Sequence, residues 1–259
     1  MIRKFLAITM AGIMLAGGVV DAPRSWFFTR ASVQEASPGW EGDFDLAEYN
    51  AFYLGDTSRK EIFLTFDEGY ENGHTAQILD VLRDKNAPAA FFVTKPYMKD
   101  EPELIRRMID EGHLVVNHTV KHKSSPTLTA QELAAELDGV EDYFKEVFGA
   151  EMAKFWRPPM GQYNLNTLQT AKEQGYATIF WSFAYQDWLI DKQPSVADAH
   201  KKVVDGLHNG AILLLHAVSS ANAAAMADII DSARALGYEF VSLHRLTGEV
   251  FPPTIRGGN

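Results

Sequence analysis

Hydrophobic and polar positions follow a regular alternation of two periodicities from about residue 59 onward. Short apolar runs of strand length are separated by longer segments in which apolar residues recur every three or four positions, as they do on one face of a helix. We predict strands over residues 61–66, 89–94, 113–117, 154–157, 177–183, 211–215 and 238–243. The helices predicted between them cover residues 75–86, 100–112 with Asp100 as N-cap, 129–149, 164–174, 195–207 and 221–236. Strands that are apolar on both faces and alternate with helices predict a parallel sheet covered by helices.

The polar residues that follow the strands distinguish two architectures. A doubly wound sheet concentrates its site at one switch point, whereas a closed barrel collects residues from the carboxyl ends of many strands. Here polar residues follow five of the predicted strands, namely Asp67 with Glu68, His118, Arg157, Asp187 and His216. This distribution favours a barrel.

The first 58 residues differ from this regular pattern. Arg3 and Lys4 precede a mostly apolar run over residues 5–20, which is typical of a signal peptide and short for a membrane span. We therefore expect residues 1–22 to be a signal peptide or N-terminal membrane anchor and the protein to be exported. A buried N-terminal helix is the alternative, but the basic start and the glycines suit it badly. We expect residues 23–58 to form an irregular, aromatic-rich extension, 59–248 to form the main domain, and 249–259 to be a C-terminal tail.

The composition of the chain limits the classes of partner and the kinds of metal site that it can have. The chain has 259 residues, 46% of them hydrophobic, and a formal net charge of −10. This acidic balance argues against a nucleic-acid partner, which requires a clustered basic face. A glycan partner stays possible, because glycans are bound by hydrogen bonds and aromatic stacking. The chain has no cysteine, so any metal must be held by histidines and carboxylates.

Two adjacent carboxylates end the first regular strand. Asp67 and Glu68 follow a run of β-forming residues and precede two glycines, Gly69 and Gly73. Burying two like charges side by side is costly unless a cation compensates them. The alternative for this pair alone is an ordinary solvated loop.

His118 and His122 are the second candidate feature. On a helical turn, a spacing of four residues puts two imidazoles on one face, where they can bind one divalent ion. Surface histidines are the alternative. Together with a strand-end carboxylate, the pair predicts a site of two histidines and one carboxylate with open positions, which binds and activates water.

Arg157 and His216 are candidates for the remaining chemistry. An arginine beside a carboxylate base keeps it ionised and oriented, and Arg157 sits at a strand end before two prolines. His216 follows a wholly apolar strand, where a proton donor is one explanation and a structural histidine is the other. Asp187 and Trp188 can supply a carboxylate partner and an apolar wall to His216.

These residues fall within five ordered motifs. They are TFDEG at 65–69, HTVKH at 118–122, RPPMG at 157–161, Asp187-Trp188 and LLH at 214–216. In this order they resemble the motifs of the polysaccharide deacetylase family, that is, the NodB-homology domain or carbohydrate esterase family 4. The extended forms TFDEGYENG (65–73), FWS (180–182) and LHAVS (215–219) are most similar to the delta-lactam-biosynthetic de-N-acetylases of spore-forming bacteria, which deacetylate N-acetylmuramic acid in spore-cortex peptidoglycan.

The resemblance implies a distorted (β/α)7 barrel and metal-assisted amide hydrolysis. It implies that Asp67 is the general base, that Arg157 orients it, and that His216 is the general acid, tuned by Asp187. One divalent ion, of which zinc is the first candidate, would be held by Glu68, His118 and His122. We expect peptidoglycan glycan strands as the partner of a monomer that meets the membrane only through its N-terminal segment. Residues expected to contact substrate are Tyr70, Trp188, Gly161 and Leu214.

Glu68 departs from the family pattern. Most members have Asp at this position and the delta-lactam subgroup resembles Asn there, whereas Glu is charged and longer than Asp. Glu68 motivates one alternative function, a glycan-binding pseudoenzyme with an impaired metal site. A second alternative is a deacetylase of N-acetylglucosamine in peptidoglycan or another exported glycan. The third, a retaining glycosidase that uses Asp67 and Asp187, leaves the two histidines without a role.

Overall fold

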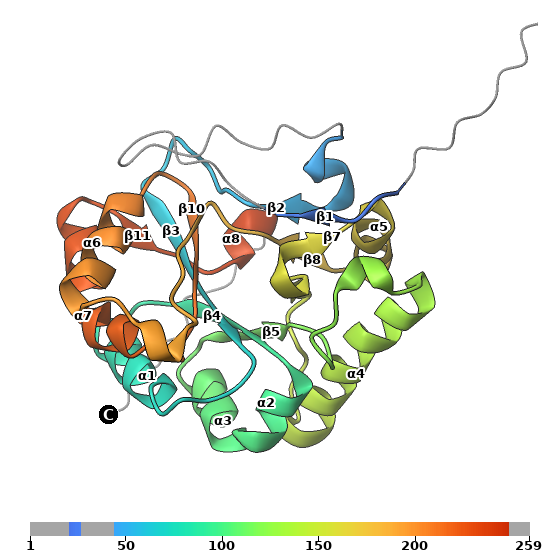
Figure 1. The fold of residues 1–259 in the computed structure, drawn as a ribbon, viewed down its shortest axis with the longest axis horizontal. Helices are drawn as coiled ribbons and strands as arrows, with labels where there is room; N and C mark the ends of the chain where they lie inside the picture. Colours follow the sequence, from blue (N-terminus) through green and yellow to red (C-terminus); the bar gives the residue numbers. More distant parts are fainter. Residues whose placement is uncertain (1–20, 27–43, 249–259) are drawn as a thin grey trace, which may run out of the picture.

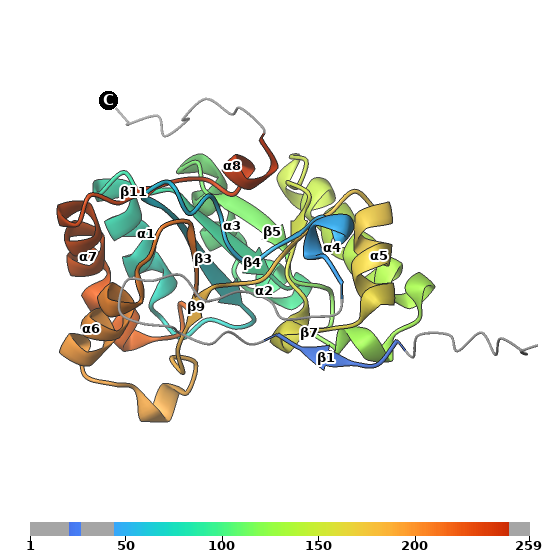
Figure 2. The ribbon, with the colours of Figure 1, turned by 90° about the horizontal axis from the view of Figure 1, so that it is seen from above.

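The fold is a curved, mostly parallel β-sheet with helices around its outside, seen in a computed structural model that describes residues 21–26 and 44–248. The strand order is β2-β8-β6-β5-β4-β3-β10-β9, with β11 pairing to β3, and every pairing between these strands is parallel. Figure 1 shows α7, α1, α3, α4 and α5 following one another around this sheet, and Figure 2 shows the same arrangement from above. The predicted α/β architecture with a distorted barrel is confirmed.

The strands of the sheet are short. They are β2 (Ala51–Phe52), β3 (Glu61–Glu68), β4 (Ala89–Val93), β5 (Leu114–Asn117), β6 (Phe155–Trp156), β8 (Ala177–Ile179), β9 (Phe183–Ala184), β10 (Ala211–Leu215) and β11 (Glu239–Phe240). A separate antiparallel pair is formed by β1 (Arg24–Ser25) and β7 (Gln162–Tyr163). The α-helices are α1 (Thr75–Asp84), α2 (Lys95–Asp100), α3 (Pro102–Asp110), α4 (Ala130–Phe148), α5 (Leu165–Glu173), α6 (Val196–Gly206), α7 (Ser220–Ala235) and α8 (His244–Thr247). The 3₁₀ helices of the described residues are η1 (Leu46–Tyr49), η2 (Ser125–Thr127), η3 (Pro159–Gly161) and η4 (Ile190–Lys192).

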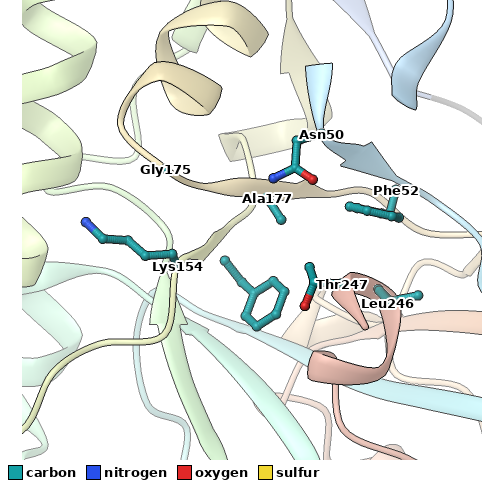
Figure 3. A pocket seen from close by; sticks show the side chains of 8 residues that line it. Asn50, Phe52, Lys154, Gly175, Ala177, Leu246 and Thr247 are labelled. Carbon is teal, nitrogen blue, oxygen red and sulfur yellow. The ribbon is translucent and has the colours of Figure 1, made fainter. Parts of the chain in front are cut away.

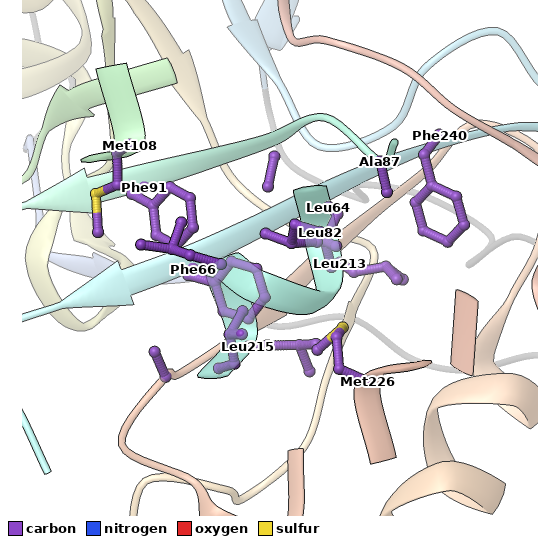
Figure 4. Packing of buried hydrophobic residues seen from close by; sticks show 14 of the residues in the cluster. Leu64, Phe66, Leu82, Ala87, Phe91, Met108, Leu213, Leu215, Met226 and Phe240 are labelled. Carbon is purple, nitrogen blue, oxygen red and sulfur yellow. The ribbon is translucent and has the colours of Figure 1, made fainter. Parts of the chain in front are cut away.

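The two faces of β3 serve two different cores. Leu64 and Phe66 pack toward the helices, in one cluster with Leu213, Leu215 and Met226 (Figure 4). Phe63 belongs instead to a second cluster, with Phe92 and Ile212, inside the curve of the sheet. Side chains of a strand alternate between faces. Even-numbered residues of β3 therefore face the helices, and odd-numbered residues face the interior of the barrel.

Two predicted elements differ from the structure. The helix expected over 100–112 with Asp100 as N-cap corresponds to α3 alone, and Asp100 is instead the last residue of α2, a helix that was not predicted. Thr94 caps α2 by accepting from the Tyr97 backbone N–H, while Pro102 opens α3 after Glu101, a residue outside the helical region. The strand expected over 177–183 is interrupted between β8 and β9. Trp181 lies in this gap and packs against Gly161, which has a φ of +63°. A Cβ at Gly161 would lie 2.6 Å from the Trp181 ring.

The extension before β3 contributes to the barrel. Strand β2 pairs with β8, and Leu54 then forms an antiparallel bridge with Ala211 at the start of β10. Trp26 stacks on Phe180 with the ring centroids 4.4 Å apart. Most of the predicted leader (1–22), part of the extension, and the tail at 249–259 lie outside the described residues. Within the described part of the chain, no helix is both long and apolar enough to span a membrane.

Candidate active site

Four of the predicted residues lie at the carboxyl edge of the sheet. Asp67 is near the end of β3, His118 directly follows β5, Arg157 follows β6, and His216 follows β10. Because these strands are parallel, their carboxyl ends meet at one edge. Leu214 of β10 pairs with Thr65 of β3, so the residues that end these two strands lie at the same level.

Arg157 forms a buried ion pair with Asp67. Its guanidinium is fully buried, with Nη1 2.6 Å from Asp67 Oδ1, and Nη2 donates to Thr65 Oγ1 at 2.9 Å. Its Nε donates to the Ile179 carbonyl at 2.9 Å. Burial by itself raises the pKa of Asp67, but the charge of the Arg157 guanidinium, the largest of the opposing effects, helps to outweigh it and lowers the pKa from 3.8. Asp67 is therefore an oriented, ionised carboxylate, as a general base requires.

His216 and Asp187 form a second pair. Asp187 is fully buried; its Oδ1 lies 2.7 Å from His216 Nδ1, and its Oδ2 accepts the His216 backbone N–H at 2.9 Å. Trp188 lies edge-on to the imidazole, at 5.5 Å between ring centroids. Burial lowers the pKa of His216, yet the hydrogen bond and charge of Asp187 raise it above 6.5 overall. With Nδ1 bound to Asp187, Nε2 is the nitrogen left to carry a proton to a substrate.

The two metal-ligand candidates His118 and His122 come together, but not on a helix as expected. The segment between them is a loop in which Thr119 and His122 have φ of +71° and +51°. The rings make a T-shaped contact with centroids 4.8 Å apart. His118 Nδ1 lies 2.9 Å from the Arg157 carbonyl, which places the proton on Nδ1 and leaves the Nε2 lone pair free. Burial lowers the pKa of His118 to about 4, so its imidazole is neutral, as metal binding requires.

Glu68 does not join the two histidines. It is an even-numbered residue of β3 and shares the helix-facing side with Phe66, whereas Asp67 faces the barrel. Both carboxylate oxygens are buried and make no hydrogen bond within the described structure. Burial, and next the negative charges of Glu71, Asp67 and Asp187, raise the pKa of Glu68 well above 4.5. Burial, and next the charge of Glu68, also raise the pKa of Tyr97, which belongs to that helix-facing core.

The donor set therefore fits a divalent ion only in part. The imidazoles of His118 and His122 are neutral, adjacent and suited to an ion such as zinc. Across the described residues, no group of three His, Asp or Glu side chains is arranged to hold a metal. Ligation by Glu68 stays a prediction, and it requires the side chain to leave the face on which strand alternation places it.

The four expected substrate contacts separate into two groups. Tyr70 and Trp188 are exposed, at 52% and 44%, on the loops that follow β3 and β9. Gly161 and Leu214 are buried. A Cβ on Gly161 would lie 2.6 Å from Trp181, so its described role is close packing. The residue before it, Met160, is 53% exposed at a φ of +58° and was not among the predicted contacts.

Sequence reasoning also missed the residues behind Asp187. Asn222 donates from Nδ2 to Asp187 Oδ2 at 2.6 Å, and the Tyr185 hydroxyl donates to Asn222 Oδ1. The only sequence signal was that Asn222 follows His216 closely, at the start of a predicted helix.

One cavity among the described residues lies away from this edge. It has a volume of about 300 Å³ and includes Lys154, Ala177 and Thr247 among its lining residues (Figure 3). These residues belong to the amino ends of β6 and β8 and to α8. None of the predicted site residues lines it. The candidate site is thus identified by its chemistry and not by a cavity.

Comparison with known proteins agrees with the motifs. A model of the polysaccharide deacetylase family matches residues 54–179. The peptidoglycan-N-acetylmuramic acid deacetylase PdaA of Bacillus subtilis is 40% identical, with 94% of this chain and 95% of that protein covered. An uncharacterized 30.6 kDa protein of Geobacillus stearothermophilus is 43% identical over 90% of this chain and 89% of its own.

The solved structures agree with the sequence matches. The structure of PdaA from Bacillus subtilis, a family 4 carbohydrate esterase, superposes with a TM-score of 0.85 over 89% of this chain and 99% of that one. These relatives match 89% to 94% of this chain. The chain belongs to the polysaccharide deacetylase family.

Proposed function

We propose that this protein hydrolyses the acetamide of N-acetylmuramic acid residues in peptidoglycan, leaving a free amine and acetate. The observation that carries the proposal is that Asp67 and His216 lie at one sheet edge, each held by a buried partner. Arg157 lowers the pKa of Asp67, and Asp187 raises the pKa of His216. The similarity to PdaA, over nearly the full length of both chains, supports muramic acid as the sugar. The amine would be available for closure of a muramic delta-lactam, as in the spore cortex.

Asp67 acts as the base in the first step. Its Oδ1 is occupied by Arg157, and its Oδ2 lies 3.6 Å from His118 Nε2, on the side where the two imidazoles meet. Oδ2 accepts a proton from water while the water oxygen bonds to the acetyl carbon. The carbonyl becomes a tetrahedral oxyanion. Arg157 keeps the carboxylate ionised and fixed before this step, so the base does not have to be reoriented.

His216 completes the reaction. Its Nε2 donates a proton to the sugar nitrogen as the carbon–nitrogen bond breaks, and acetate and the amine leave. Asp187 accepts from Nδ1 throughout and stabilises the imidazolium before the transfer. A divalent ion bound at His118 and His122 would supply polarisation of the acetyl carbonyl.

N-Acetylglucosamine is the second candidate substrate. The peptidoglycan-N-acetylglucosamine deacetylase of Bacillus cereus is 34% identical over 73% of this chain and 89% of its own. The catalytic groups described above act on an acetamide on either sugar. Discrimination between the two sugars would depend on the loops that carry Tyr70, Met160 and Trp188. These three side chains are exposed.

A glycan-binding pseudoenzyme is the third candidate. The orientation of Glu68 away from the histidines favours it, because that geometry leaves the predicted metal site without its anionic ligand. The intact pairs Asp67–Arg157 and His216–Asp187 favour an enzyme.

The location proposed is the outside of the cytoplasmic membrane, at the cell wall. Peptidoglycan lies there, and residues 1–22 have the charge and hydropathy of an export signal or anchor. The formal net charge of −10 agrees with a glycan in place of a polyanionic partner.

One assay tests the proposal. Peptidoglycan stripped of its stem peptides is incubated with the protein, with chelator, and with chelator followed by zinc or another divalent metal. Acetate is measured and the free amine is located by mass spectrometry. Amine on muramic acid supports the proposal, and amine on glucosamine supports the second candidate. Glycan binding with no acetate under any metal identifies the pseudoenzyme.

A further inference from the structure

The buried carboxylate of Asp187 makes hydrogen bonds through both oxygens, one at Oδ1 and two at Oδ2. Oδ1 meets His216 Nδ1, whereas Oδ2 accepts two donors, the His216 backbone N–H at 2.9 Å and Asn222 Nδ2 at 2.6 Å. The first two contacts come from the residue that Asp187 must orient. Among the described residues, Asn222 is therefore the donor to this carboxylate that does not belong to His216. It lies on a different element, α7.

Asn222 is held by hydrogen bonds at its backbone N–H, its side-chain oxygen and its side-chain nitrogen, the last of which donates to Asp187. It is fully buried in the first turn of α7, where its backbone N–H donates to the capping Ser219 hydroxyl at 3.1 Å. The Tyr185 hydroxyl donates to Oδ1 of the side chain. An amide whose oxygen accepts a hydrogen bond must present its nitrogen on the other side. Tyr185 therefore determines that Asn222 offers a donor, and not an acceptor, to Asp187.

The loop that carries Asp187 is tied to the same helix a second time. Gln193 donates to the Asp187 carbonyl at 2.6 Å, and the Ser219 hydroxyl donates to Gln193 Oε1 at 2.5 Å. The backbone of Asp187 is thereby held through Gln193. Its carboxylate depends on Asn222 for the rotation that brings Oδ1 to His216.

We propose that Asn222, with its amide oriented by Tyr185, is a positioning residue that holds Asp187 in the rotamer needed to align the His216 acid. This inference rests on the proposed deacetylase function. The competing explanation is that Asn222 serves only to pack the start of α7. The two differ in what happens to His216 when the Asn222 amide is removed and the helix is kept.

Loss of the amide has a defined consequence. Oδ2 would keep only the backbone donor, and the carboxylate would be free to turn away from His216 Nδ1. The raised pKa of His216 depends on that contact, so it should fall toward its ordinary value of 6.5. Other charged groups around His216 are Asp67 and Arg157, with His122 nearby, and Glu68 and Tyr185 lie near Asp187. Asp67, Arg157, His122 and Glu68 stay in place in both variants below, and Tyr185 is changed only in Tyr185→Phe.

The test uses Asn222→Leu, which keeps the side-chain volume without a donor, and Tyr185→Phe, which removes only the hydroxyl. Asn164→Ala is the control, because Asn164 is a buried asparagine that caps α5 and whose side chain pairs with Thr167 instead of with Asp187. Acetate release is measured for kcat and KM across pH. The pKa of His216 is measured by NMR in substrate-free protein, with His216→Ala to assign the signal.

For Asn222→Leu we expect a loss in kcat of about tenfold with KM changed by less than about twofold. The NMR pKa and the alkaline limb of kcat should both move to lower pH. Tyr185→Phe should show a smaller change in the same direction, which keeps the test valid if Asn222→Leu fails to fold. Asn164→Ala should change thermal stability alone.

A His216 pKa that stays constant or rises in both folded variants overturns the inference, whatever the rate. So does an unchanged kcat in both. The wild-type assay separates this result from failure of the proposed function. If the wild type releases no acetate, the proposed function fails, while the NMR titration still decides whether Asn222 positions the pair.

Discussion

Arg157 contacts Asp67 and His118 at the same time. Its Nη1 lies 2.6 Å from Asp67 Oδ1, and its backbone carbonyl lies 2.9 Å from His118 Nδ1. One buried residue therefore orients the candidate base and fixes the tautomer of a candidate metal ligand. Pro158 and Pro159 follow it directly and restrict the backbone at this point. The rigidity of this turn is a requirement of the site.

Asp67→Asn should nearly abolish acetate release and leave the fold intact. An amide cannot accept the proton of the attacking water, and general base catalysis alone contributes on the order of 10²–10⁴-fold. The measurement is kcat at saturating substrate, with circular dichroism to verify folding. A variant that keeps more than about a tenth of the wild-type rate would show that Asp67 is not the base.

His216→Ala should lower kcat by about 10²-fold or more with little change in KM. The leaving nitrogen must be protonated, and Nε2 of His216 is the free nitrogen of the Asp187-bound imidazole. Steady-state kinetics on a soluble muramic-acid-containing oligomer measures both constants. An unchanged kcat with a raised KM would assign His216 to binding.

The pH dependence of kcat/KM should be bell-shaped. Activity requires Asp67 ionised and His216 protonated. The pKa of Asp67 is lowered from 3.8, so the acid limb should lie below that value, and the pKa of His216 is raised from 6.5, so activity should fall only as pH rises above it. Rates from about pH 3 to pH 10 give both limbs. An alkaline limb centred below 6.5 would contradict the Asp187–His216 pair as described.

Metal titration addresses Glu68. Because the described side chain faces the helices, we expect the wild type, Glu68→Asn and Glu68→Asp to bind zinc with affinities within about threefold of one another, through His118 and His122. Calorimetry on the three metal-free proteins measures this, with His118→Ala as the control that should lose binding. Weak binding by Glu68→Asn, restored in Glu68→Asp, would instead establish ligation by Glu68 as the sequence predicts.

Glu68→Gln should stabilise the metal-free protein at neutral pH and not at low pH. The folded pKa of Glu68 is raised above 4.5, so below that pH the carboxyl is protonated whether folded or unfolded and costs nothing extra. As pH rises above 4.5, the unfolded chain releases the proton first. Stability of the wild type then falls by up to about 1.4 kcal/mol per pH unit until the folded pKa is reached. Urea unfolding at about pH 4 and pH 7.5 measures the difference, and equal effects at both would contradict a buried, unpartnered carboxyl.

Sequence alone was sufficient to identify the strand-end residues. Asp67, His118, Arg157 and His216 each follow an apolar run of strand length, and the helices between these runs imply a parallel sheet. In such a sheet the carboxyl ends must share one edge, so residues far apart in the chain were expected to meet. Local chemistry and topology together determine this part of the site.

Only the tertiary structure decided how the side chains of these residues are held. The direction of Glu68 depends on which face of β3 meets the helices, and the helix-facing core around Phe66 decides that. The contact of Asn222 with Asp187 joins residues 35 positions apart, and α2 and α3 divide at Glu101. Neither leaves a periodic trace in the sequence. Strand and helix periods report local geometry, whereas contacts between loops depend on the packing of the whole barrel, which the chain reaches only when folded.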